Sequence, residues 1–208
     1  MKKSLLRLLM IIPLALVLCF TIGYQKQEKE GIIKEELTTK AQEAVIEYVH
    51  PEALASTEWL AIHLSDPSVC VIDARYPPNK TFFEGGHIPG AVFVNIYDDL
   101  ADPNATIPLM ILPQDAFEQL MGRLGISNNT TVVVYDIQGG LWCSRIWWAL
   151  RYYGHDSVKI LDGGLLKWML EERPLEAGTV TSTLTTFQAH VRPELIATTE
   201  DIKAAIQD

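Results

Sequence analysis

The clearest hydrophobic pattern in the chain lies between residues 131 and 153, where a short apolar run leads through a loop into an amphipathic stretch. The run T-V-V-V-Y, at residues 131–135, is rich in β-branched residues and too short for a helix, so it predicts a strand. Both of its faces are apolar, which is typical of a strand buried between two helical layers in a parallel sheet. After the loop, apolar residues at helical spacing predict one buried helix face: Trp142, Ile146, Ala149, Leu150 and Tyr153.

Short apolar runs and amphipathic stretches alternate along the rest of the chain as well. Three more buried strands are expected, at residues 69–73, 92–96 and 158–161. The further helices are expected at residues 58–64 and 165–171, from a start within residues 112–115 to about Leu124, and from Thr198 or Thr199 to Asp208. Strands that alternate with helices predict an α/β fold with a mostly parallel sheet and helices on both of its faces.

The loop D-I-Q-G-G, at residues 136–140, is the first candidate for chemistry. A strand followed by a tight loop and a helix directs several backbone N–H groups to one point, and this predicts an anion cradle. Many α/β enzymes place a nucleophile at the first residue of such a loop. Here that residue is Asp136, and its surroundings suggest no nucleophilic role. We therefore expect the reactive position of the loop to be vacant.

Composition and charge narrow the possible functions. The chain has 208 residues, 48% of them hydrophobic, which is enough for one average domain with extensions. A net charge of −9 argues against nucleic acid as a partner, because phosphate backbones are bound by basic surfaces. The three cysteines, Cys19, Cys70 and Cys143, have no C-x-x-C spacing and belong to no His/Cys cluster. We therefore expect no metal site, no disulfide scaffold and no cofactor.

The first 23 residues resemble a signal peptide. Lys2, Lys3 and Arg7 form a basic start, residues 8–20 are apolar, and Thr21-Ile22-Gly23 supplies small residues for cleavage. We expect export to a periplasmic or extracellular location, and membrane contact only through this segment if it is retained as an anchor. Residues 24–50 are charged with mixed sign and are expected to be a linker without function.

A polar cluster is predicted around two turns. Asp73 and Arg75 end the strand at residues 69–73, and the turn G-G-H-I-P-G-A follows at residues 85–91. His87 in that turn could be a general base. No nucleophile lies near it in the sequence, so we favour a histidine that pins the turn by donating to the backbone or to Asp73.

Cys143 is the one cysteine near the loop. It begins the helix, where the helix dipole can lower the pKa of a thiol. It also lies seven residues beyond the first loop position, and free cysteines are usually buried, so a packing role is favoured. A reactive Cys143 would make the protein a sulfur carrier or a small phosphatase-like enzyme.

Together these motifs resemble those of rhodanese domains, in the same order. They are V-I-D-A-R at residues 71–75, G-H-I-P-G-A at 86–91, V-V-V-Y-D at 132–136 and L-D-G-G-L-L-K-W at 161–168. R-I-W-W, which begins at Arg145, and the nearby Y-G-H are similar to the first module of tandem thiosulfate and 3-mercaptopyruvate sulfurtransferases. The resemblance covers residues 53–178 and makes Asp73, Arg75, His87 and Arg145 structural motif residues.

The resemblance implies a division of labour between two modules. In that family only the second module carries the catalytic cysteine, and the first has an aspartate at the nucleophile position, where Asp136 stands here. A carboxylate cannot carry a persulfide sulfur, and its charge repels an anionic donor such as thiosulfate. We therefore expect an inactive rhodanese-like domain at residues 51–178, followed at 179–208 by a linker and the start of a second module. Leu141 and Trp142, at the rim of the loop, are expected to face that module or to form a wall of its pocket.

Two functions of different classes remain open. The first is an N-terminal portion of an exported sulfurtransferase, whose partner is a second module of the same chain and whose substrate is a small anionic sulfur donor. The second is a stand-alone, non-catalytic module that binds a protein or a small anion. A reading frame that continues past Asp208 into a cysteine-bearing loop would favour the first, and a stop codon there would favour the second.

Overall fold

The computed structural model of the chain describes residues 48–76 and 80–207. The predicted signal segment at residues 1–23 and most of the charged stretch at 24–50 lie outside the described residues. Residues 50–208 form one structural unit, which holds all the helices and strands described below. Within the described residues, no helix has both the length and the apolar character needed to cross a membrane.

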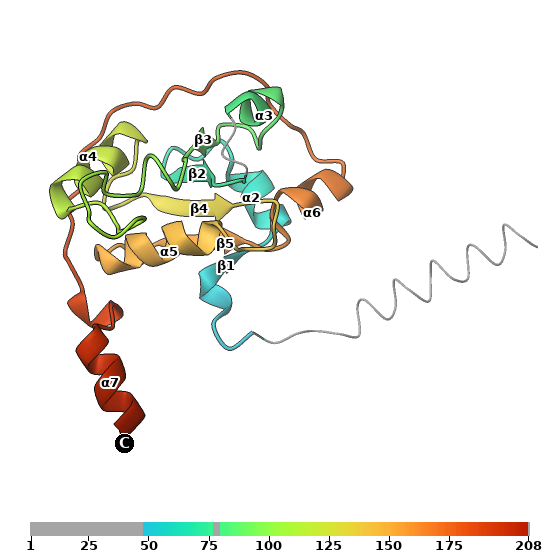
Figure 1. Ribbon diagram of the computed structural model, residues 1–208. Coiled ribbons are helices and arrows are strands. Elements are labelled where there is room, and N and C mark those ends of the chain that lie inside the picture. The colour runs from blue at the N-terminus through green and yellow to red at the C-terminus, as the bar shows by residue number, and fades with distance from the viewer. Residues whose placement is uncertain (1–47, 77–79, 208) are drawn as a thin grey trace, which may run out of the picture. The chain divides into compact units, whose positions relative to one another are not determined.

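A parallel five-stranded sheet forms the centre of this unit (Figure 1). Its strands follow one another in space in the order β1 (Leu54–Ala55), β5 (Val158–Leu161), β4 (Thr131–Tyr135), β2 (Val69–Asp73) and β3 (Val92–Phe93). Three predicted strands, at residues 69–73, 131–135 and 158–161, are confirmed with the same bounds. The strand predicted at 92–96 ends at Phe93, because Asn95 begins a turn in which its backbone N–H bonds the Asp99 carboxylate.

Helices cover both faces of the sheet, as the alternating pattern predicted. The elements outside the sheet are η1 (Pro51–Ala53), α2 (Thr57–His63), α3 (Lys80–Gly85), α4 (Gln114–Arg123), α5 (Cys143–Tyr152), α6 (Gly164–Leu170), η2 (Pro193–Leu195) and α7 (Thr199–Gln207). The core on one face joins α4 and α5 to residues such as Val132 and Val134. The core on the other face joins α2, α3 and α6 to Val133 and Tyr135, so successive residues of β4 point to opposite layers.

The register of the sheet brings two functional segments together. Ile72 lies beside Val134 and Asp73 lies beside Tyr135, so the carboxyl ends of β2 and β4 meet at one edge. The loop that contains Asp136 starts at this edge, which is where parallel α/β sheets place their sites.

Residues 179–192, called the strap below, follow α6 without regular secondary structure, as expected of a linker. The strap is nevertheless docked on the domain: it passes α4 and returns toward the C-terminal end of α5 (Figure 1). Phe187 and Ala189 in the strap are buried in the core beneath α4 and α5. At Gly122 an added Cβ would lie 2.7 Å from the Thr185 carbonyl oxygen, so only glycine permits this approach. The strap is therefore part of the folded domain.

The end of the described chain repeats its beginning. V-H-P-E-A-L-A-S-T-E at residues 49–58 corresponds to V-R-P-E-L-I-A-T-T-E at residues 191–200. Both stretches form a short 3₁₀ helix at the Pro-Glu pair, then an extended residue, then an α-helix: η1, Leu54 and α2 in the first, and η2, Ile196 and α7 in the second. The same local signals thus produce the same local structure twice.

Candidate functional site

The predicted anion cradle exists, and the carboxylate of Asp136 fills it. Asp136 Oδ1 accepts hydrogen bonds from the backbone N–H groups of Gln138 and Gly140, at 2.9 and 3.0 Å. Its Oδ2 accepts from the backbone N–H groups of Trp142 and Cys143, at 2.8 and 3.2 Å. The side chain is buried, with 1% of the residue exposed. Asp136 is therefore an internal anion, and the donors that could hold a ligand are already bound to it.

The shape of this loop depends on its two glycines. Gly139 and Gly140 have φ angles of 71° and 99°, in the left-handed region that other residues rarely adopt. These angles help to turn the N–H groups of Gln138 and Gly140 toward the loop centre, where Trp142 and Cys143 at the start of α5 add theirs. The D-I-Q-G-G pattern was thus sufficient to predict the cradle, and the structure adds that the loop's own first residue occupies it.

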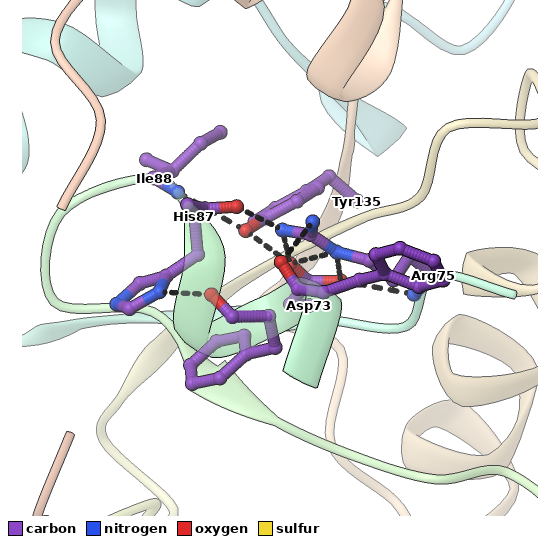
Figure 2. Close-up of polar contacts among 8 residues, drawn as sticks. Asp73, Arg75, His87, Ile88 and Tyr135 are labelled. Atoms are coloured by element: carbon purple, nitrogen blue, oxygen red, sulfur yellow. Dashed lines mark hydrogen bonds and ion pairs between the residues drawn. The ribbon is translucent and has the colours of Figure 1, made fainter. Parts of the chain in front are cut away.

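A buried ionic network holds the neighbouring carboxyl ends of β2 and β4 together (Figure 2). Asp73 accepts from the backbone N–H and the guanidinium of Arg75, with Arg75 Nε 2.8 Å from Asp73 Oδ2. The hydroxyl of Tyr135 donates to the same carboxylate over 2.6 Å. Arg75 also donates to the carbonyl oxygens of Phe82 and Gly86, at 3.1 and 2.8 Å. The guanidinium therefore ties both strand ends to α3 and to the turn that follows it.

Tyr135 completes this network, a role that no sequence pattern indicated. It lies in an apolar strand and reads as a core residue, yet its hydroxyl also accepts from the backbone N–H of Ile88, at 3.2 Å. Burial, together with the Asp73 carboxylate, raises the pKa of Tyr135 well above its ordinary value, so the phenol stays protonated and donates. The polar groups of Asp73, Arg75 and Tyr135 are bonded to one another and to the backbone, so the network has a structural role.

His87 pins a turn, as the sequence favoured, but its partner differs from one of those expected. Its Nδ1 lies 2.8 Å from the carbonyl oxygen of Phe83, which can only accept, so Nδ1 carries the hydrogen. Its ring stacks on that of Phe83, and Asp73 is bonded to Arg75 and Tyr135 instead. The backbone of His87 also exchanges two hydrogen bonds with Glu176. His87 is fully buried, which does not suit a general base.

Neither described cysteine has the surroundings of a nucleophile. Cys143 is 1% exposed, and burial together with the nearby Asp136 carboxylate raises the pKa of its thiol to about 12. Burial also raises the pKa of Cys70 to about 12. A thiol must ionise to attack sulfur, so these environments favour the packing interpretation over a sulfur carrier that depends on Cys143.

The two residues at the rim of the loop differ in how far they are exposed. Leu141 is 61% exposed. Trp142, which the helical spacing also placed on the buried face of the helix, is half-buried because its ring packs against those of Tyr76 and Tyr97, with centroids 4.9 and 5.8 Å away. Sequence spacing could not reveal this contact, because Tyr76 and Tyr97 follow other strands.

Arg145 lies one turn into α5 and reaches across to the segment before α4. Its Nη2 donates to the carbonyl oxygen of Leu109, a non-glycine residue with a φ of 63°. Its Nε is buried and has no hydrogen-bond partner among the described residues. Burial lowers the pKa of the guanidinium, and no described carboxylate lies within ion-pair distance of it.

The described residues contain no cluster that could hold a metal. No group of three or more His, Cys, Asp or Glu side chains converges in this part of the chain. Two cavities, of about 510 and 300 Å³, lie along the strap, and neither is lined by the loop at residues 136–140.

Comparison with known proteins agrees with this geometry. Residues 56–171 match the family model described as a rhodanese-like domain, which is more than half of the chain. The chain belongs to the rhodanese-like family. This rhodanese-like module has the parallel sheet and two helical layers that the sequence predicted.

Individual relatives are sulfurtransferases and a sulfur carrier. The chain is 36% identical over 167 residues to human 3-mercaptopyruvate sulfurtransferase, an alignment that covers 74% of this chain and 56% of the human protein. It is 40% identical over 128 residues to the sulfur carrier protein TtuD of Thermus thermophilus, covering 62% of this chain and 43% of that protein. The crystal structure of the 3-mercaptopyruvate sulfurtransferase SseA from Escherichia coli superposes with a TM-score of 0.69 at 32% identity, covering 75% of this chain and 62% of that one. The chain thus spans about half the length of the curated relatives it matches.

Proposed function

We propose that this chain is the N-terminal portion of a sulfurtransferase, which moves sulfane sulfur from thiosulfate or 3-mercaptopyruvate to a thiophilic acceptor. Its rhodanese-like module does not itself react. It supports a second, catalytic module of the same chain, which binds the small anionic donor. The observation that carries this proposal is the Asp136 carboxylate, which accepts four backbone N–H groups at the centre of the loop.

The chemistry of sulfur transfer explains why this carboxylate excludes catalysis in the module. A thiolate attacks the outer sulfur of thiosulfate, a persulfide S–S bond forms, and sulfite leaves with the electron pair of the broken bond. The carboxylate of Asp136 cannot form such a persulfide. It also occupies the four N–H groups that would hold an anionic donor, and its charge repels one.

The repeated segment is an argument for the proposed second module. Residues 191–207 carry the sequence and the local structure with which residues 49–63 begin the first module. In the first module this segment supplies an edge strand and a helix that cover the sheet. A second segment of the same kind is therefore an argument for a second rhodanese-like sheet, which this segment would cover.

Export is part of the proposal. The basic start, apolar run and small residues within the first 23 positions support a signal segment, and therefore support export to a periplasmic or extracellular compartment. Fractionation of cells that express the complete protein, with and without residues 2–23, tests this point. Retention of both forms in the cytoplasm would contradict it.

Turnover assays test the role of Asp136. The chain is expected to transfer no sulfur from thiosulfate to cyanide above background, and Asp136→Ala is expected to be equally inactive. Asp136→Cys places a thiol at the focus of four N–H donors, which stabilise a thiolate. Incubation of this variant with thiosulfate should add one sulfur atom, detected by intact-protein mass spectrometry.

Two results would overturn the proposal in different ways. Turnover by the unchanged chain that disappears in Cys143→Ser would identify Cys143 as a nucleophile. A stop codon directly after Asp208 in the coding DNA would instead favour a stand-alone binding module, whereas a continuing frame with a cysteine at the corresponding loop position is the expected result.

A further inference from the structure

The connection between the module and the repeated segment contains no flexible linker of free length. Its last part is bonded to the module almost residue by residue: the backbone N–H groups of Thr185, Ala189 and His190 donate to Gly122, Glu118 and Tyr153 respectively. Asn128 and Gln188 exchange two further hydrogen bonds. The repeated segment begins at Val191, so no free linker separates it from the strap.

The first residues of the repeated segment are themselves bound to α5. The backbone N–H of Arg192 donates to the carbonyl oxygen of Tyr152 over 2.8 Å. The guanidinium of Arg192 makes two hydrogen bonds to the Asp156 carboxylate, at 2.7 and 2.6 Å. Further on, the indole Nε1 of Trp148 donates to the carbonyl oxygen of Leu195, at 3.2 Å. The segment therefore leaves the module along one side of α5.

That side of α5 carries a row of large side chains, which we call the flank. Its members follow helical spacing from the Asp136 loop to the strap: Leu141, Arg145, Trp148 and Tyr152. Trp148 and Tyr152 stack, with ring centroids 5.5 Å apart, and both are only half-buried. Leu141 is exposed at the other end. Half-exposed aromatic residues beside a cation are typical of interface centres.

Arg145 gives the flank a charge that its surroundings leave unpaired. The nearest described acceptor is the Leu109 carbonyl oxygen, and the guanidinium has no described carboxylate partner. The side chain of Leu109 is 44% exposed, and that of Ile107, two residues earlier in the same segment, is 65% exposed. A fitting occupant therefore carries an apolar surface with one acidic group that reaches Arg145.

We propose that the flank of α5 is the seat of the second rhodanese-like module, and that the docked strap holds that module there in one fixed orientation. This inference rests on the proposed function. It adds which surface the second module contacts, that an acidic group of that module pairs with Arg145, and that the strap fixes the orientation of the two modules. Because the connection has no free length, the second module meets the flank without the entropy cost of closing a loop.

Two variants of the complete protein test the seat against a matched control. Trp148→Ala removes the centre of the flank, whereas Trp147→Ala removes a second half-buried tryptophan of α5 that packs on the same core but lies off the row. A four-residue Gly-Ser insertion after Arg192 adds slack and leaves the core untouched. Limited proteolysis at residues 190–198 and small-angle X-ray scattering report on the junction and on the arrangement of the modules.

The expected outcome separates the variants. Trp148→Ala and the insertion should each speed cleavage at the junction at least about tenfold and broaden the distance distribution, because a central interface tryptophan is lost or bypassed. Trp147→Ala should leave both readouts within about twofold of the unchanged protein.

Three other results would contradict the inference. If the second module is present but neither Trp148→Ala nor the insertion changes the junction, the proposed seat is wrong while the proposed function stands. A reading frame that stops after Asp208 would overturn the proposed function and the seat together. A dimer of the chain that dissociates in Trp148→Ala would make a second copy the occupant and overturn the inference.

Discussion

Residues 49–63 and residues 191–207 have nearly the same sequence and the same local structure, but their surroundings differ. In the first segment, Leu54 and Ala55 pair with Ile160 and Leu161 of β5, and Leu60 is fully buried. In the second, Ile196 is equally extended, yet no described strand pairs with it, and no residue of α7 is buried.

The comparison separates local from tertiary causes. Proline at the start of the 3₁₀ helix, a hydroxyl at the N-cap of the α-helix and acidic residues in its first turn are local signals, and they act in both segments. Burial needs a sheet to cover, and only the first segment has one among the described residues. The exposed apolar side of α7, with Ile202 at 52%, is the face that a second sheet would bury.

The largest expected effect comes from the matched apolar positions of the two helices. Leu60→Ala removes a fully buried side chain and should lower the free energy of unfolding by about 2–5 kcal/mol. Ile202→Ala, at the corresponding place in α7, should change it by less than about 0.5 kcal/mol in this chain. Urea unfolding of the two variants measures both values. In the complete protein, Ile202→Ala should also become costly, and equal small effects in both contexts would argue against a buried α7.

An effect of intermediate size is expected where the strap packs on α4. Gly122 lies in α4, and alanine in place of glycine normally stabilises a helix by about 1 kcal/mol. Here the added Cβ would meet the Thr185 carbonyl oxygen at 2.7 Å, so Gly122→Ala should instead destabilise the chain by about 1–3 kcal/mol. Gly85→Ala in α3 is the control, because nothing lies within 4 Å of its Cβ. Stabilisation by both substitutions would show that the strap is not docked in solution.

The smallest effect distinguishes the two helix caps. The Ser56 hydroxyl accepts from the backbone N–H of Trp59, and the Thr198 hydroxyl accepts from that of Asp201. Ser56→Ala should lower the unfolding free energy by about 1 kcal/mol, because α2 unfolds together with the sheet. Thr198→Ala should leave that value unchanged and only reduce the helix content of α7, measured by circular dichroism. A shift of the main unfolding transition by Thr198→Ala would mean that α7 is already coupled to the core.

The sequence predicted most of this fold because its signals act over short distances. The apolar run of β4, the glycines at 139 and 140 and the spacing along α5 each specify local geometry, and their alternation along the chain implies a parallel sheet. The sequence also predicted that Asp136 leaves the reactive position without a nucleophile. A carboxylate cannot form a persulfide, whatever the geometry of the loop.

Only the tertiary structure decided which distant groups meet. The Tyr135 hydroxyl reaches Asp73 because β2 and β4 are neighbours, and Trp142 is half-buried because Tyr76 and Tyr97 lie over it. A polar, threonine-rich stretch reads as a free linker, yet it docks through the buried Phe187 and the close approach at Gly122. Sequence spacing carries no record of such contacts, because they depend on the packing of elements far apart in the chain. By itself the sequence determined most of the strands and helices and the absence of a nucleophile at the first loop position, but it indicated neither β1 nor α3. The packing decided that the Asp136 cradle is filled and that the chain leaves the module along α5.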